Sequence, residues 1–149
     1  MVMATASPSE AANSIVNVSL WDKGASADMA TDLGMGMGTH DMSKATMGVK
    51  VSPASVKAGE VTFEVKNNSK DTVHEMIVVP IEDKSKPLPY IAAENRVDED
   101  GAGHLGEVSE LDPGKSGALR LKLNPGKYAL FCNVPGHFMN GMWTVLTVK

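Results

Sequence analysis

The chain has 149 residues, of which 42% are hydrophobic, and a formal net charge of -4. This length and composition predict one domain over residues 1–149 with a buried core, and the acidic balance argues against nucleic-acid binding and favours an electropositive partner. No apolar run approaches the length of a bilayer span, which predicts a soluble protein. The single cysteine excludes an internal disulfide.

The first 13 residues carry small side chains but lack the apolar core of a signal peptide. They predict a disordered tail, or a remnant left by cloning or by signal cleavage. Signal cleavage would suit a protein whose lone thiol is protected by burial or by a metal in an oxidising compartment. We therefore expect a periplasmic or otherwise exported protein.

Strand patterns cover most of the remaining chain. Residues 15–21 alternate apolar and polar side chains, as a half-buried strand does. The pattern then dissolves into Gly, Ala, Met and Asp, which predicts an irregular methionine-rich insertion (residues 22–44). Further strands are predicted at residues 45–51, 60–66, 73–79, 104–108, 117–123, 128–133 and 143–148, and residues 90–97 predict a short helix or an irregular connection.

Polar turns separate the predicted strands. Two Pro-Gly-Lys turns, at residues 113–115 and 125–127, frame the strand 117–123, because proline presets the first turn angle and glycine accepts the positive φ that follows. Many short strands with little helix predict an all-β fold, an antiparallel Greek-key β-sandwich or barrel.

The lone cysteine begins a regular series of metal-ligand residues. Cys132, His137 and Met142 follow one another at five-residue steps in the loop between the last two predicted strands, which we call the ligand loop (residues 132–142). A thiolate with a thioether favours copper over hard cations, and two imidazoles, a thiolate and a weak axial methionine describe an electron-transfer copper site. A second histidine must therefore come from elsewhere in the chain.

His74 is the best candidate for that ligand among the four histidines. It begins an apolar strand after an Asn-rich turn, which places it at an end of the sandwich, and it points to the same face as Met76. Met76 is predicted to be a core residue and not a ligand. His104 is predicted to be solvated or hydrogen-bonded locally, and not a ligand. Met139, only two residues beyond His137, competes with Met142 as axial ligand, and Met142 is favoured.

Together these residues resemble the cupredoxin family, the blue copper proteins of the plastocyanin, azurin and rusticyanin type. The resemblance rests on His74, Leu111-Asp112-Pro113-Gly114, Pro125-Gly126-Lys127-Tyr128 and the ligand loop. It implies one type 1 copper ion with His74, Cys132 and His137 as equatorial ligands and Met142 as the axial ligand. It also implies a monomeric one-electron carrier, not an enzyme, that serves a redox partner such as a c-type cytochrome or a copper or haem enzyme.

Two positions depart from the family pattern. Family members often have asparagine directly after the first histidine, where it ties the two ligand segments together, and this chain has Glu75. A glycine often follows shortly after the axial methionine, and here Met142 is followed by Trp143. Both positions bear on the copper geometry.

The predicted route for the electron is a mostly apolar surface around the edge of His137. Its expected members are Pro135, Gly136, Phe138 and Met139.

The methionine-rich insertion admits two interpretations. Its candidate metal-binding residues are Met29, Met35, Met37, His40, Met42 and Met47. Flexible thioethers fill irregular gaps, which predicts packing near the copper end. Exposed thioethers with a histidine can instead bind copper(I), which would make the protein a copper-delivery or storage protein. A cupredoxin domain of a larger copper oxidoreductase is a further alternative.

Overall fold

The computed structural model describes residues 12–38 and 41–149. Most of the predicted tail and His40 lie outside the described residues. The first strand, β1 (Ala12–Asp22), begins at Ala12, so residues 12 and 13 belong to the sheet and not to the tail. No helix in the described ranges is long and apolar enough to cross a membrane.

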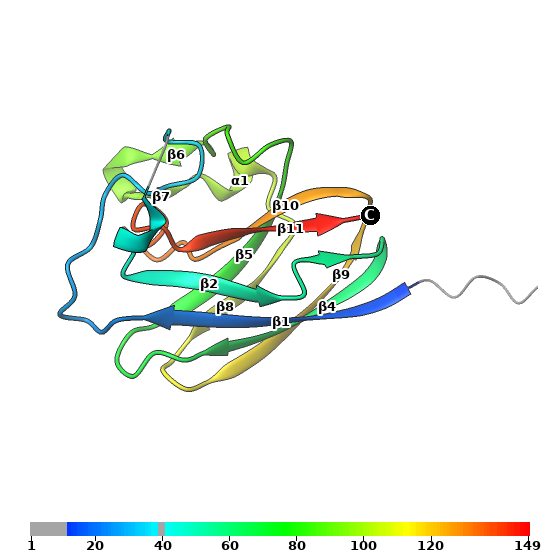
Figure 1. Ribbon diagram of the computed structural model, residues 1–149, viewed down its shortest axis with the longest axis horizontal. Helices are drawn as coiled ribbons and strands as arrows, with labels where there is room; N and C mark the ends of the chain where they lie inside the picture. Colours follow the sequence, from blue (N-terminus) through cyan, green and yellow to red (C-terminus); the bar gives the residue numbers. More distant parts are fainter. Residues whose placement is uncertain (1–11, 39–40) are drawn as a thin grey trace, which may run out of the picture.

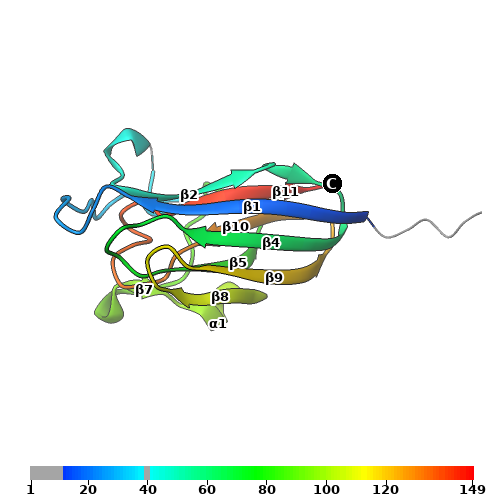
Figure 2. The same cartoon turned by 90° about the horizontal axis from the view of Figure 1, so that it is seen from below.

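Two sheets pack face to face as a β-sandwich (Figures 1 and 2). The first sheet has the order β2-β1-β4-β9 and adds β2 (Met47–Ser52), β4 (Gly59–Asn67) and β9 (Ser116–Leu123) to β1. The second has the order β3-β11-β10-β5-β8 and consists of β3 (Ser55–Val56), β5 (His74–Ile81), β8 (Gly106–Leu111), β10 (Gly126–Phe131) and β11 (Trp143–Val148). The all-β sandwich prediction is confirmed.

Both sheets are mixed, although an antiparallel fold was expected. β1 pairs with β4 in parallel, with Val16 opposite Phe63, and the short β3 pairs with β11 in parallel. The remaining pairs of the two sheets are antiparallel. An alternating side-chain pattern reports which face of a strand is buried but not the direction of its neighbour, so the sequence could not reveal the parallel pairs.

The main core lies between the sheets and follows the alternation seen in the sequence. Val16, Val18 and Leu20 of β1 point inward and are at most 3% exposed. They belong to the same cluster as Leu130 and Leu146 of the opposite sheet. Burying a side chain of this size contributes roughly 1.5–3 kcal/mol, so this interior holds the sheets together and fixes their ends relative to one another.

The second sheet is also covered on its outer face. Ile77 and Val79 of β5 and Phe131 of β10 pack outward against Met35 and Phe138. This second cluster explains why residues 76–79 of β5 are continuously apolar instead of alternating, since a strand segment buried on both faces needs apolar side chains at every position.

The connection between β5 and β8 supplies part of that cover. It forms a small two-stranded sheet of β6 (Tyr90–Ile91) and β7 (Arg96–Val97) around the 3-10 turn η2 (Ala92–Glu94), followed by α1 (Glu99–Ala102). Residues 90–97, expected as a short helix or an irregular connection, thus contain a short 3-10 turn, but the strand pair on either side of it was not foreseen. Another 3-10 turn, η1 (Met42–Lys44), forms the end of the methionine-rich insertion.

Candidate metal centre

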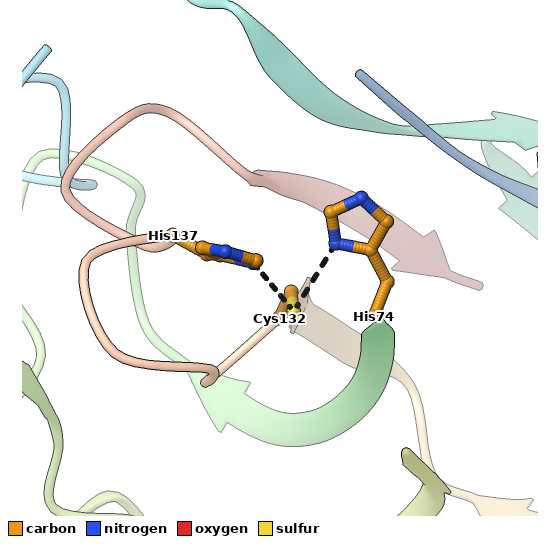
Figure 3. A group of neighbouring side chains, drawn as sticks. All are labelled: His74, Cys132 and His137. Carbon is orange, nitrogen blue, oxygen red and sulfur yellow. Dashed lines mark hydrogen bonds between the residues drawn. The ribbon is translucent and has the colours of Figure 1, made fainter. Parts of the chain in front are cut away.

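Three buried side chains converge at one end of the sandwich (Figure 3). His74 begins β5 and Cys132 directly follows β10. β5 and β10 are antiparallel, with Phe131 opposite Ile77, so the start of one strand and the end of the other reach the same end. Cys132 Sγ lies 3.9 Å from Nδ1 of His74 and 3.5 Å from Nδ1 of His137, and the ring centroids are 5.0 Å apart.

The ligand loop is closed by its own backbone. The backbone N–H of Cys132 donates to the carbonyl of Met142. The N–H of Met142 donates to the carbonyl of His137, and the N–H of His137 donates to the carbonyl of Val134. Gly136 lies at a φ of +84°, a conformation that other L-residues rarely adopt, and so lets the chain reverse directly before His137. These bonds bring both ends of the loop to neighbouring positions on β10 and β11.

The two methionines of the loop face different parts of the molecule. Met142 is 0% exposed and packs in the main core with Cys132. Met139 is half-buried and packs in the outer cluster, where its sulfur lies against Gly34 of the insertion. Met142, the predicted axial ligand, therefore packs between the two sheets, whereas its competitor Met139 packs on the outer face of the second sheet.

The three converging groups have the electrostatics of a soft-metal site. Burial raises the pKa of the Cys132 thiol to about 12, although the N–H groups of Glu75 and Val134 act in the opposite direction. Burial, followed by the neighbouring His74, lowers the pKa of His137 to about 4, and burial also lowers the pKa of His74. Both imidazoles are therefore neutral near pH 7, and a buried cation would stabilise the thiolate. This donor set fits copper.

Glu75 bridges the two ligand segments through its backbone N–H and through its carboxyl group, which faces the N–H of Asn133. Its N–H donates to Cys132 Sγ at 3.3 Å. Burial, together with smaller contributions from nearby carboxylates, raises the pKa of its carboxyl group to about 7, although the N–H of Asn133 acts in the opposite direction. The contributing carboxylates belong to Glu99, Glu107 and Glu110.

Two asparagines tie the ligand loop to its surroundings. The Asn133 amide exchanges two hydrogen bonds with the backbone of Val97, of 2.8 and 3.0 Å. The Asn140 amide accepts from the N–H of Ala30 and donates to the Thr46 hydroxyl, both at 2.8 Å. Sequence reasoning missed both residues, because a polar residue in a loop gives no sign of its distant partners.

Asp22 was also missed. Its Oδ2 lies 2.7 Å from Nε2 of His74, on the side of the ring away from Cys132, and its side chain is only 3% exposed. In the sequence, Asp22 is visible only as a carboxylate at the end of the first apolar strand. That position does not indicate which histidine the carboxylate contacts.

The family described as the sulfocyanin (SoxE) domain matches residues 43–149. This chain belongs to the sulfocyanin domain family of cupredoxins. The predicted family is thereby confirmed, and since cupredoxins bind type 1 copper, the predicted cofactor is confirmed with it. Cupredoxins are blue copper electron carriers that exchange electrons with redox partners.

Solved blue copper proteins share the fold. Auracyanin from Roseiflexus castenholzii is 19% identical over 93% of this chain and 98% of its own, with a TM-score of 0.55. Rusticyanin from Thiobacillus ferrooxidans is 17% identical over 92% of this chain and 77% of its own, with a TM-score of 0.57. Auracyanin A from Chloroflexus aurantiacus is 18% identical over 93% of this chain and 100% of its own, with a TM-score of 0.55. No curated protein gives a significant match.

In this cupredoxin the methionine-rich insertion packs over the copper end (Figure 1). The Leu33 N–H donates to the carbonyl of Met139, and the Trp143 indole N–H donates to the carbonyl of Leu33 at 2.8 Å. Met35 is 1% exposed within the outer cluster. Trp143, which directly follows Met142, thus helps to hold the insertion in place.

The methionines of this region divide into two groups. Met35 and Met47 are buried, which agrees with the packing interpretation. The exposed group consists of Met29, Met37 and Met42, with exposures of 43%, 48% and 39%. His104 is exposed in the loop before β8, away from the three converging side chains.

The apolar surface expected around His137 is largely covered. Phe138 is 2% exposed inside the outer cluster, and His137 is 6% exposed. A Cβ atom at Gly136 would lie 3.2 Å from both the Asn95 amide and the Met29 methyl group. The expectation that Gly136 and Phe138 form the surface is wrong, because the insertion and the β6–β7 connection pack over them.

Proposed function

We propose that this protein is a one-electron carrier in which His74, Cys132 and His137 hold copper equatorially and Met142 holds it axially. The observation that carries the proposal is the convergence of two Nδ1 atoms on one buried thiol sulfur at 3.9 and 3.5 Å. The arrangement belongs to a chain of a cupredoxin family.

Bound copper would supply a centre that alternates between copper(II) and copper(I) by gaining and losing one electron. The protein's contribution is a ligand set that changes little between the two states. His74 is anchored in β5, where it pairs with Leu111 of β8, and the Cys132–Met142 backbone hydrogen bond closes the ligand loop. A site held from both sides resists rearrangement, which favours fast electron exchange.

Burial supports Met142 as the axial ligand. Its side chain shares the main core with Cys132, whereas Met139 packs in the outer cluster. A thioether is a weak ligand for copper(II), and its strength is one of the factors that set the potential.

The partner is proposed to be a redox protein, such as a c-type cytochrome or a copper or haem enzyme, in an exported or periplasmic setting. The net charge of -4 favours a partner with a basic docking face. Because Phe138 and Gly136 are covered, the partner would approach His137 at the exposed Pro135 and the adjoining Met29.

Visible absorption and paramagnetic resonance of the copper(II)-loaded protein test the proposal. An intense thiolate-to-copper band is expected from the wild type and from Met139→Leu, and no such band is expected from Cys132→Ala. A wild type that shows the band but lacks fast electron self-exchange would reject the carrier function and would leave the proposed copper site standing. Absence of the band from the wild type would reject both.

A further inference from the structure

A buried carboxylate contacts the outer nitrogen of one copper-ligand candidate. Asp22 Oδ2 lies 2.7 Å from His74 Nε2, and the side-chain exposures of the two residues are 3% and 0%. No comparable carboxylate contacts the ring of His137 in the described part of the chain. The two histidines that face Cys132 are therefore supported differently.

The carboxylate is itself held in place. Asp22 Oδ1 accepts the N–H of Gly24 at 2.8 Å, which leaves Oδ2 for the ring. A carboxyl side chain is ordinarily ionised at neutral pH. The contacts with Gly24 and His74 fix the orientation of Asp22 before any metal binds.

The contact selects one form of the imidazole. An ionised carboxylate only accepts hydrogen bonds, so a neutral His74 must carry its proton on Nε2 to satisfy the contact. Nδ1 then has a free lone pair, and Nδ1 is the atom that faces Cys132 Sγ at 3.9 Å. Carboxylates that receive the second N–H of a ligating histidine fix its tautomer and orientation and raise its basicity.

We propose that Asp22 is a positioning residue that holds His74 as the Nε2–H tautomer and places a fixed negative charge one imidazole away from the copper. This inference rests on the proposed function. The negative charge stabilises copper(II) more than copper(I), because copper(II) carries the larger charge. Asp22 therefore lowers the tendency of the site to accept an electron from its partner.

The substitution Asp22→Asn keeps the size of the side chain and removes the charge. Loss of such a partner typically weakens metal binding 10- to 100-fold, and we expect about a tenfold loss of copper(II) affinity. If copper(I) affinity is unchanged, the reduction equilibrium shifts about tenfold towards copper(I), which is about 59 mV for one electron. Asp22→Ala also removes the acceptor and is expected to disturb the copper(II) paramagnetic spectrum.

Asp71→Asn is the matched control. Asp71 is an exposed neighbour that acts on His74 through its charge, and its carboxylate accepts the Ala25 N–H and the hydroxyl groups of Thr72 and Ser69. Removing this screened charge is expected to shift the reduction equilibrium by less than about twofold. The potentials and copper(II) affinities of the wild type, Asp22→Asn and Asp71→Asn should be measured in parallel.

Nitrogen-15 resonances of His74 in the copper-free wild type provide a test that needs no variant. The Nε2–H tautomer at neutral pH supports the inference, and the Nδ1–H tautomer overturns it, whether or not Asp22→Asn folds. Equal potentials for Asp22→Asn and Asp71→Asn in a protein whose wild type is blue would overturn the inference alone. A wild type without the visible band would overturn the proposed function, and the role of Asp22 with it.

Discussion

The ligand loop and the methionine-rich insertion lie at the same end of the sandwich but are held in different ways. The ligand loop is closed by its own short-range backbone bonds, including Cys132 to Met142. The insertion is held by bonds to residues far away in sequence, since Leu33 bonds to both Met139 and Trp143. A loop whose conformation is fixed by its own hydrogen bonds can hold metal ligands in place. A segment that depends on bonds to distant residues is better suited to covering the site.

Removing a buried methionine from the insertion should have the largest effect on stability. Met35→Ala is expected to lower the free energy of unfolding by about 2–5 kcal/mol, because it leaves a cavity in the outer cluster. The exposed Met37→Ala should change it by less than about 0.5 kcal/mol. Urea unfolding of both variants gives the values, and equal losses would contradict the packing role of the insertion.

If the insertion is only a cover, Met35→Ala should keep the wild-type visible and paramagnetic spectra once it is loaded with copper. A changed spectrum in the folded variant would mean that the insertion also shapes the copper site.

Asn140 joins the two segments, and its loss should have the next largest effect. Asn140→Ala removes the bonds to Ala30 and Thr46 and is expected to lower the free energy of unfolding by about 1–3 kcal/mol, since the half-buried partners of this fully buried side chain lose their hydrogen bonds. In hydrogen-exchange measurements, the variant should exchange its Ala30 amide faster than the wild type does, while the exchange rate of the Met142 amide should change less. The reverse order would mean that the ligand loop depends on the insertion.

The two methionines of the ligand loop should separate the metal site from its cover. Met142→Leu is expected to shift the reduction equilibrium about tenfold towards copper(I), because it removes a weak ligand that favours copper(II). Met139→Leu, which packs in the outer cluster, should shift it less than about twofold. Voltammetry of the two variants measures the shifts, and a larger shift from Met139→Leu would exchange their roles.

A charge on the exposed part of the cover should have the smallest effect on the site itself. Met29 is exposed and lies beside Gly136. The substitution Met29→Lys is expected to change the free energy of unfolding by less than about 0.5 kcal/mol and to leave the copper spectrum unchanged. Electron exchange with a basic redox partner should slow severalfold, because two positive charges would meet. An unchanged rate, measured by stopped flow with Met37→Lys as control, would place the docking surface elsewhere.

Patterns that are local in sequence predicted much of the fold. The alternation at residues 15–21 corresponds to β1, and the predicted strands at 117–123 and 143–148 correspond closely to β9 and β11. The two-residue β3 and the four-residue α1 were missed, because such short elements carry no periodic pattern. The small sheet of β6 and β7 was missed for the same reason.

The ligand spacing in one loop, together with one strand-start histidine, was enough to predict copper. The sequence fixes the chemistry of Cys132, His137 and Met142, and a loop this short keeps them close together. Only the tertiary structure decided that Asp22 meets His74, that Glu75 reaches Cys132 through its backbone, and that the insertion covers Phe138. Those contacts join segments distant in sequence, and their geometry depends on how the two sheets pack.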